Sequence, residues 1–269
     1  MKPVFNIFRQ KKFRFEKLYC DSVDDSGNCF IVYLAKLDCR FVSFCYSGLI
    51  HIDGKGFVTG SSSFKGIDIP GGKILKINVE EPGIEGTWKS TDSPLVRTLL
   101  RDEDNGDLIW NCHHPKAATE IRFKNMLHKG RGYAETLVLP MMPYRLPVDE
   151  IRWGRFLSDV TTVIWICWKG ARPLNILFLN GCEYSDAEFS VNGITFGEKL
   201  FRLSFSEVRI IRKGTFDDLF PGKPILKFII GRGILKSMET KYIAKTTFSR
   251  NSIFTASGWS IYEEVMWRR

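Results

Sequence analysis

A glutamate on an apolar strand face is the residue best placed to do chemistry. The segment Gly130-Arg131-Gly132-Tyr133-Ala134-Glu135-Thr136 opens a strand-like run, and alternation puts Glu135 on the face of Tyr133 and Leu137. A carboxyl group that points where leucines point is expected to be buried. Burial of an unpaired carboxyl raises its pKa and makes it a general acid, whereas a nearby guanidinium would hold it in an ion pair.

Two further side chains could orient this acid or a substrate. In residues 151–157, alternation puts Trp153 and Arg155 on the same face, so Arg155 could point inward beside its tryptophan. His113 is a candidate pocket residue on a neighbouring segment. We therefore predict a catalytic group of Glu135, His113 and Arg155.

Aromatic side chains are concentrated around these residues and could line a binding pocket. The run 163–168 is apolar on both faces, as expected for a strand buried on two sides or for one that lines a pocket. Aromatic rings attract a developing positive charge through their π faces. The predicted substrate-binding residues are Tyr133, Trp110, Trp153, Trp165 and Trp168.

The neighbouring Cys112-His113-His114 admits other interpretations. Adjacent histidines on a strand point to opposite faces, so both reach one metal only if the chain bends, and His128 is the one other histidine nearby. A Cys112 nucleophile would need a base from elsewhere in space. One hydrogen-bonded core histidine and one solvent histidine is the simplest interpretation, and we predict no metal site and no cofactor.

The sequence lacks the motifs of several common enzyme classes. It contains no Walker loop, no Gly-x-Ser-x-Gly elbow and no His-Glu-x-x-His helix. Gly130 and Gly132 do not follow the dinucleotide fingerprint, and we expect them to permit a tight turn or bulge into the strand that carries Glu135.

Short runs of β-branched and aromatic residues recur from end to end, each closed by Gly, Pro, Asn or Asp, and such runs predict strands. No alternating long helices accompany them. We therefore predict an all-β protein of two packed antiparallel barrels or sandwiches with a few short helices. The predicted strands are Cys29–Ala35, Arg40–Tyr46, Ile74–Val79, Leu108–Cys112, Ala118–Phe123, Tyr133–Leu139, Ile151–Phe156, Thr162–Trp168, Asn175–Leu179, Glu188–Val191, Leu200–Phe205, Val208–Ile211, Ile225–Ile230, Tyr242–Thr247 and Ile253–Met266.

One helix and one domain boundary are also predicted. Ser93–Arg101 has Ser at the N-cap position, Pro at the first helical position and a helical spacing of apolar residues. The proline cluster Pro140–Pro147 is unsuited to a sheet interior and predicts the crossover between halves. We place the two domains at residues 1–143 and 144–269.

The net charge of +9 lies mostly near the C-terminus, because residues 207–269 hold 12 Lys/Arg against 6 Asp/Glu. Spaced through strand-like segments, these cations predict a basic outer wall that could associate with a membrane surface; no zinc-finger, KH or RRM pattern supports nucleic-acid binding. The ten cations spaced through the strand-like segments are Arg209, Arg212, Lys213, Lys223, Lys227, Arg232, Lys236, Lys241, Lys245 and Arg250. Seven irregularly spaced cysteines, no secretory signal and no long apolar segment favour the cytoplasm.

Five motifs stand out in the central block, over roughly 60 residues: Trp110-x-Cys112-x-x-Pro115-x-Ala117, Gly130-x-Gly132-Tyr133-x-Glu135, Leu146-Pro147, Arg152-Trp153-Gly154-Arg155 and Val163-x-Trp165-x-x-Trp168-x-Gly170. With these motifs the block resembles a two-domain lipocalin-like family that includes carotenoid 1,2-hydratases (hydroxyneurosporene synthases) and AttH-like proteins. Fungal pericyclases and some terpene cyclases are structurally akin to this family.

This resemblance implies two lipocalin-like β-barrels and a hydrophobic ligand. In the hydratases the glycine motif continues as Gly-Tyr-x-Asp-His, with the acidic residue implicated in protonating an alkene. Glu135 stands in the place of that acid, and Thr136 stands where the family has His. The resemblance therefore implies the fold and the kind of ligand more firmly than one particular reaction.

Three classes of function remain open at this point. The first is a cofactor-independent hydratase, cyclase or isomerase that acts on a polyene or isoprenoid-like molecule, with Glu135 as general acid. The second is a non-catalytic carrier of a hydrophobic molecule, in which Glu135 and Arg155 form an internal ion pair. The third is a module that binds anionic surfaces through its basic C-terminal half.

Overall fold

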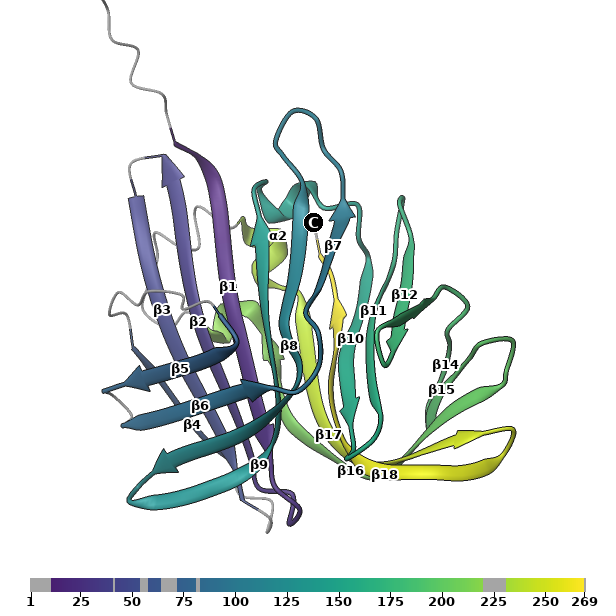
Figure 1. The fold of residues 1–269 in the computed structure, drawn as a ribbon. Helices are drawn as coiled ribbons and strands as arrows, with labels where there is room; N and C mark the ends of the chain where they lie inside the picture. Colours follow the sequence, from purple (N-terminus) through teal and green to yellow (C-terminus); the bar gives the residue numbers. More distant parts are fainter. Residues whose placement is uncertain are drawn as a thin grey trace, which may run out of the picture.

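The structure, a computed structural model, describes residues 11–40, 42–53, 58–63, 72–80, 83–219 and 231–268. Over these residues the chain forms two curled antiparallel sheets (Figure 1). This arrangement confirms the predicted all-β class with two lipocalin-like half-barrels. The predicted strand Ile225–Ile230 and the cations Lys223 and Lys227 lie outside the described residues.

The N-terminal sheet has the strand order β4-β3-β2-β1-β9-β8-β6-β5, with β7 also paired to β8. Strand β8 is long, and it pairs with β7 through its first half and with β6 through its second. The strands are β1 (Lys11–Val23), β2 (Cys29–Arg40), β3 (Val42–Ile52), β4 (Val58–Ser63), β5 (Ile74–Val79), β6 (Ile84–Ser90), β7 (Leu95–Leu100), β8 (Leu108–Phe123) and β9 (Met126–Leu139).

The C-terminal sheet has the order β13-β12-β11-β10-β18-β17-β16-β15-β14. Its strands are β10 (Glu150–Leu157), β11 (Thr162–Lys169), β12 (Leu174–Leu179), β13 (Cys182–Tyr184), β14 (Glu188–Ser190), β15 (Gly193–Phe196), β16 (Phe201–Thr215), β17 (Met238–Arg250) and β18 (Ile253–Met266). Short helical turns are η1 (Pro143–Arg145), η2 (Phe216–Leu219) and α2 (Arg232–Leu235). The chain passes between the sheets through η1, and the predicted boundary between residues 143 and 144 falls in this connection.

The predicted helix Ser93–Arg101 is wrong, because Leu95–Leu100 forms strand β7. Pairing with β8 satisfies its backbone groups and buries Leu99 and Leu100 in the core between the sheets. The capping signals before this segment are local, and tertiary pairing outweighs them.

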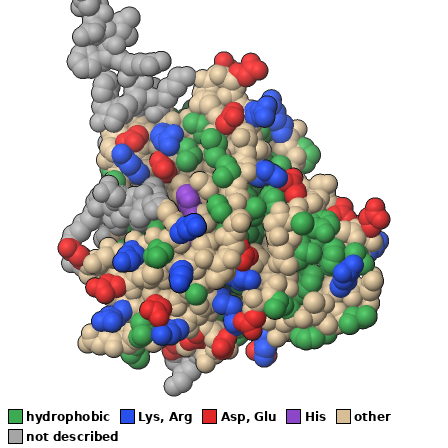
Figure 2. Space-filling model, viewed as in Figure 1, with side chains coloured by type: hydrophobic (Ala, Val, Ile, Leu, Met, Phe, Trp, Pro, Cys, Tyr) green, Lys and Arg blue, Asp and Glu red, His purple; other side chains and the backbone are tan. Residues whose placement is uncertain are grey.

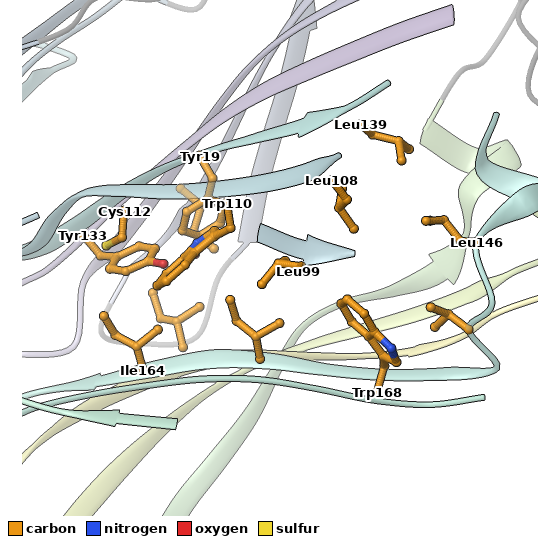
Figure 3. Packing of buried hydrophobic residues seen from close by; sticks show 14 of the residues in the cluster. Tyr19, Leu99, Leu108, Trp110, Cys112, Tyr133, Leu139, Leu146, Ile164 and Trp168 are labelled. Atoms are coloured by element: carbon orange, nitrogen blue, oxygen red, sulfur yellow. The ribbon is translucent and has the colours of Figure 1, made fainter. Parts of the chain in front are cut away.

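Three hydrophobic clusters follow from the alternation of the strands. One fills the curl of the N-terminal sheet around Leu18 and Trp88, and another fills the curl of the C-terminal sheet around Trp165 and Phe196. The third lies between the sheets and takes side chains from both. Figure 3 shows this third cluster, in which Tyr19, Trp110 and Tyr133 of the N-terminal sheet face Ile164 and Trp168 of the C-terminal sheet.

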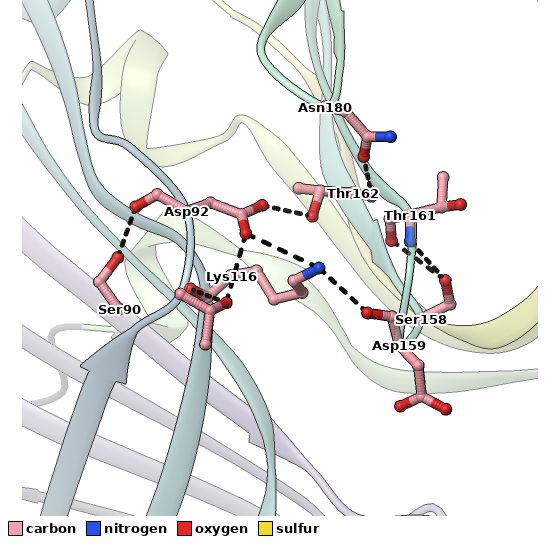
Figure 4. A network of polar contacts seen from close by, with 9 residues as sticks. Ser90, Asp92, Lys116, Ser158, Asp159, Thr161, Thr162 and Asn180 are labelled. Carbon is pink, nitrogen blue, oxygen red and sulfur yellow. Dashed lines mark hydrogen bonds and ion pairs between the residues drawn. The ribbon is translucent and has the colours of Figure 1, made fainter.

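A polar network joins the two sheets at one margin of their contact (Figure 4). The Thr162 hydroxyl donates to Asp92 Oδ2 at 2.9 Å, and Lys116 Nζ donates to the Asp159 carbonyl at 3.2 Å. The Asn180 side-chain oxygen accepts from the Thr162 backbone N–H at 2.8 Å. These contacts close this margin with polar groups, so the apolar space between the sheets lies away from it.

The outer surface carries charges of both signs. On the face in Figure 2, Lys and Arg are interspersed with Asp and Glu over the N-terminal sheet. In the C-terminal sheet Lys213, Lys245 and Arg250 are exposed, as a basic outer wall requires, but Lys241 is only 2% exposed. The assignment of Lys241 to the outer wall was wrong, because its strand face packs against the other sheet. Across the described residues no helix has the length and apolar character to span a membrane.

Candidate functional site

Strand β9 places Glu135 in the space between the two sheets. Glu135 is flanked in register by Cys112 of β8 and Tyr19 of β1, and it is 4% exposed. Of the expected turn or bulge at Gly130 and Gly132, the turn is wrong, since both lie inside β9, but the pairing of β9 with β8 is irregular next to Gly132. A Cβ at Gly132 would collide with the Asp21 carbonyl oxygen, so glycine lets β1 and β9 approach closely there. The register shifts lie in the β8–β9 pairing, between Cys112 and Ala117.

Three donors converge on one oxygen of Glu135. Trp110 Nε1 and the Tyr133 hydroxyl each donate to Glu135 Oε2 at 2.5 Å. Trp153 Nε1 donates to the same oxygen at 3.1 Å, from the opposite sheet. Because Oε2 accepts these three hydrogen bonds, a proton carried by this carboxyl group would reside on Oε1.

Burial decides the protonation of Glu135. Removal from water raises the pKa of its carboxyl group, although the Lys17 ammonium and the hydrogen bonds from Tyr133 and Trp110 oppose this shift. The balance is a raised pKa, which is the condition for a general acid.

Arg155 does not pair with Glu135, so the predicted internal ion pair between them is wrong. Its Nη2 and Nε bind Asp21 Oδ1 and Oδ2 at 2.6 and 3.1 Å, and its Nη1 donates to the Trp259 carbonyl at 2.7 Å. Tyr19 donates to Asp21 Oδ2 at 3.0 Å. Burial opposes the charge on Arg155, but pairing with Asp21 outweighs it and raises the pKa of the guanidinium.

Asp21 was not among the predicted site residues, although the alternation of its strand indicates that it is buried. In strand β1 alternation puts Asp21 on the face of Tyr19 and Val23, the same pattern that drew attention to Glu135. Asp21 and Arg155 are each at most 2% exposed, and they connect β1 to β10. Their ion pair therefore joins the two sheets and leaves Glu135 without a guanidinium partner.

His113 is half-buried and lies away from Glu135. Its Nε2 is 2.7 Å from the Thr136 hydroxyl, on the neighbouring position of β9 whose side chain has the opposite orientation. Burial lowers the pKa of its imidazole. His114 Nε2 lies 3.1 Å from the Lys73 carbonyl oxygen. The two histidines thus have separate partners, and among the described residues no group of three or more His, Cys, Asp or Glu could hold a metal ion.

An apolar cavity of about 270 Å³ lies between the sheets and takes its walls from both. Trp153 and Trp168, two of the predicted binding residues, line it. Trp110 and Tyr133 contact Glu135 instead of the cavity. Trp165 lies on the other face of β11, where it packs with Phe205 and Tyr262 inside the C-terminal half.

Trp153 connects the acid to this cavity. Its indole N–H binds Glu135, and its side chain forms part of the cavity wall. Glu135 itself is not among the residues that line the cavity, and Trp153 contacts both the carboxyl group and the cavity.

Charged side chains form a row on the strands of the C-terminal sheet, and two of them, Glu263 and Arg212, line the cavity. This row was not predicted from the sequence. Lys241 pairs with Glu263 on the adjacent strand, and its Nζ lies 5.6 Å from the ring centre of Tyr19 on the opposite sheet. Burial raises the pKa of Glu263, but the ammonium groups of Lys241 and Lys17 outweigh this and lower it. The register partners across β10, β18, β17 and β16 are Trp153, Glu263, Lys241 and Arg212, which we call the charged row.

The facing row on the N-terminal sheet has a single charge. Leu137, Lys17, Ala35 and Tyr46 are register partners across β9, β1, β2 and β3, and all four line the cavity. Lys17 thus lies on the strand next to the one that carries Glu135. These residues escape sequence reasoning because no local pattern brings β1, β17 and β18 together.

The fold is similar to those of several solved structures. CghA with Sch210972 has a TM-score of 0.65 and 9% identity, with coverage of 96% of this chain and 89% of the other. Kievitone hydratase from Nectria haematococca has a TM-score of 0.57 and 9% identity, with coverage of 94% and 88%. A candidate AttH protein from Nitrosomonas europaea has a TM-score of 0.53 and 9% identity, with coverage of 99% and 100%.

The sequence matches no family model and no curated protein. At 9% identity the likeness to solved structures concerns the fold. It confirms the lipocalin-like architecture implied by the sequence resemblance, and the similar structures include an AttH protein and a hydratase, as that resemblance implied.

Proposed function

We propose that the protein is a cofactor-independent hydratase, cyclase or isomerase that acts on a hydrophobic small molecule bound between the two sheets. Glu135 is the general acid. The observation that carries the proposal is a buried carboxyl group with a raised pKa, whose hydrogen-bond donor Trp153 also lines an apolar cavity.

The chemistry follows from the position of the proton. Glu135 Oε1–H delivers its proton to one carbon of a C=C bond, and the π electron pair forms the new C–H bond. The adjacent carbon becomes a carbocation, which the π faces of Trp153 and Trp168 in the cavity wall stabilise. Water then adds and loses a proton, or a neighbouring carbon loses a proton. Alternatively, a second C=C bond attacks and forms a ring with a new carbocation, which is quenched in one of the same two ways. In each case the released proton returns to the Glu135 carboxylate.

The hydrogen bonds on Oε2 support this cycle. Trp110, Tyr133 and Trp153 donate to the oxygen that gains negative charge when the proton leaves. Such preorganised donors stabilise the carboxylate as it forms and cost no reorganisation during the reaction. Among the proteins of similar fold, one is a hydratase, and another has been crystallised with a small molecule, which supports an enzyme of this general class.

The experiment starts from the ligand that the protein retains. Organic extracts of natively purified protein are examined by mass spectrometry, and the lipophiles found are incubated with wild type and with Glu135→Gln. We expect conversion by the wild type, either with a gain of water or to an isomer, and at least a hundredfold slower conversion by the variant. The exposed Glu120 provides the matched control, Glu120→Gln, which should convert at the wild-type rate.

A second candidate is a non-catalytic carrier, which is favoured by the hydrogen bond between the Trp153 indole and Glu135. Under this candidate Trp153 and the three hydrogen bonds hold Glu135 as a fixed part of the wall. The same experiment separates the two, because a carrier returns every extracted lipophile unchanged. If wild type and Glu135→Gln convert the lipophile at the same rate, Glu135 is not the general acid.

A further inference from the structure

The charges around the cavity do not cancel one another. Both carboxylates that line the cavity from the C-terminal sheet are near cations: Glu263 contacts Lys241, and Glu239 lies 3.6 Å from Arg212 Nη1 and 3.9 Å from Lys241 Nζ. Lys17 lines the cavity from the opposite sheet, and within the described residues it makes no ion pair shorter than 4.0 Å. One positive charge is therefore left without a paired anion.

Lys17 acts electrostatically on two carboxyl groups, Glu263 and Glu135. Glu263 already contacts Lys241, and burial raises the pKa of Glu135 although Lys17 opposes this shift. When Glu135 carries its proton, the cations Lys17, Lys241 and Arg212 outnumber the carboxylates Glu239 and Glu263. A half-buried charge in this position costs free energy that an anionic ligand would recover.

Unused hydrogen-bond donors lie in the same cavity wall. In the part of the chain that the structure describes, the donors Arg212 Nη2 and Trp267 Nε1 and the acceptor Glu239 Oε2 are buried without a hydrogen-bond partner, and all three residues line the cavity. Buried donors are rarely left unpaired in folded proteins. A ligand that brings acceptor oxygens into this space would supply both the missing negative charge and the missing acceptors.

We propose that the substrate is an apolar molecule with one anionic oxygen group, such as a carboxylate, and that Lys17 binds this group. This inference deepens the proposed function and rests on it for the identity of the binding cavity. Binding at Lys17 places the apolar body of the molecule along Trp153 and Trp168, beside Glu135. Lys17 is then a specificity-determining residue and takes no part in proton transfer.

Two fluorescent probes of nearly the same shape test the charge requirement. 8-Anilinonaphthalene-1-sulfonate is anionic, and N-phenyl-1-naphthylamine has the same aromatic body without the sulfonate. We expect wild type to bind the anionic probe at least tenfold more tightly. Lys17→Met should weaken binding of the anionic probe about tenfold and change the affinity for the neutral probe less than twofold. Lys17→Arg should keep most of the preference, because it keeps the charge.

Lys129 on β9 provides the matched control, since it is exposed and pairs only with the surface residue Glu120. Lys129→Met should leave both affinities unchanged. The proposal would be overturned if Lys17→Met lost affinity for both probes equally, or lost affinity for neither.

Wild type provides a test that does not depend on the folding of a variant. Decanoate should displace the neutral probe at a concentration at least tenfold lower than decan-1-ol does, and equal displacement would overturn the proposal. Both measurements report binding alone. If the protein binds anionic probes more tightly but converts no lipophile, the proposed enzymatic function is wrong and the inference about Lys17 still holds.

Discussion

Trp153 Nε1 donates to Glu135 Oε2 at 3.1 Å, and the indole that makes this bond also forms the wall of the cavity. Trp153 of the C-terminal sheet thus contacts Glu135 of the N-terminal sheet. Burial, which raises the pKa of Glu135, and this contact bring a carboxyl group of raised pKa close to an apolar cavity.

Removal of this donor should change the pH at which the acid works. Trp153→Phe keeps an aromatic wall but loses the N–H that stabilises the carboxylate, so the pKa of Glu135 should rise further. Because the protonated form is the active one, the alkaline limb of the profile of kcat/KM against pH should move to higher pH. Trp165→Phe, on the other face of the C-terminal sheet, should leave that limb in place, and identical shifts in the two variants would contradict the assignment.

Glu135 should also make the stability of the fold depend on pH. Its pKa is raised in the folded protein, so the folded state binds the proton more tightly than the unfolded state does. The stabilisation is fully present below the unfolded pKa of about 4.3 and is lost as pH rises through the folded pKa, at up to about 1.4 kcal/mol per pH unit. Glu135→Gln should remove this loss, as measured by urea unfolding at a series of pH values. Parallel curves for wild type and variant would show that the carboxyl group is already ionised.

The ion pair between Asp21 and Arg155 should be the most sensitive contact between the sheets. Asp21→Asn leaves the Arg155 guanidinium buried without its counterion, and the free energy of unfolding should fall by about 3–5 kcal/mol. Asp25→Asn is the control, because Asp25 is exposed and its pair with Arg131 lies at the surface. Its loss should cost less than about 1 kcal/mol. A similar small cost for Asp21→Asn in denaturant unfolding would mean that the pair does not hold the sheets together.

Gly132 should tolerate no side chain. A Cβ there would meet the Asp21 carbonyl oxygen, which belongs to the backbone and cannot turn away. Gly132→Ala should therefore force β1 and β9 apart, with a loss of about 1–3 kcal/mol in the free energy of unfolding. An unchanged melting temperature would show that close approach of these strands is not required.

The sequence predicted the strands of the site better than the contacts within it. The predicted strands Tyr133–Leu139, Ile151–Phe156 and Thr162–Trp168 are confirmed, and alternation correctly buried Glu135 and Arg155. Alternation is a local property and can be read from neighbouring residues.

Contacts between distant strands could not be predicted in the same way. The partner of Arg155 is Asp21, which lies 134 positions away in the sequence, and only the packing of β1 against β10 brings them together. Lys241 was assigned to the surface because lysine is rarely buried, but Glu263 on the adjacent strand neutralises it. The helical signals before Leu95 failed for the same reason, since pairing with β8 is not encoded locally.

Deuterium incorporation at carbon reports directly on proton transfer from Glu135. The extracted lipophile is converted in a single turnover in D2O with the protein in excess, so that the hydron on the Glu135 carboxyl group comes from the solvent. If Glu135 protonates a carbon of the substrate, the product should gain one non-exchangeable deuterium in mass spectra, and Glu135→Gln should yield no such product. If wild type forms the product without deuterium on carbon, Glu135 is not a general acid. The cavity would then serve in binding or in cyclisation without proton transfer.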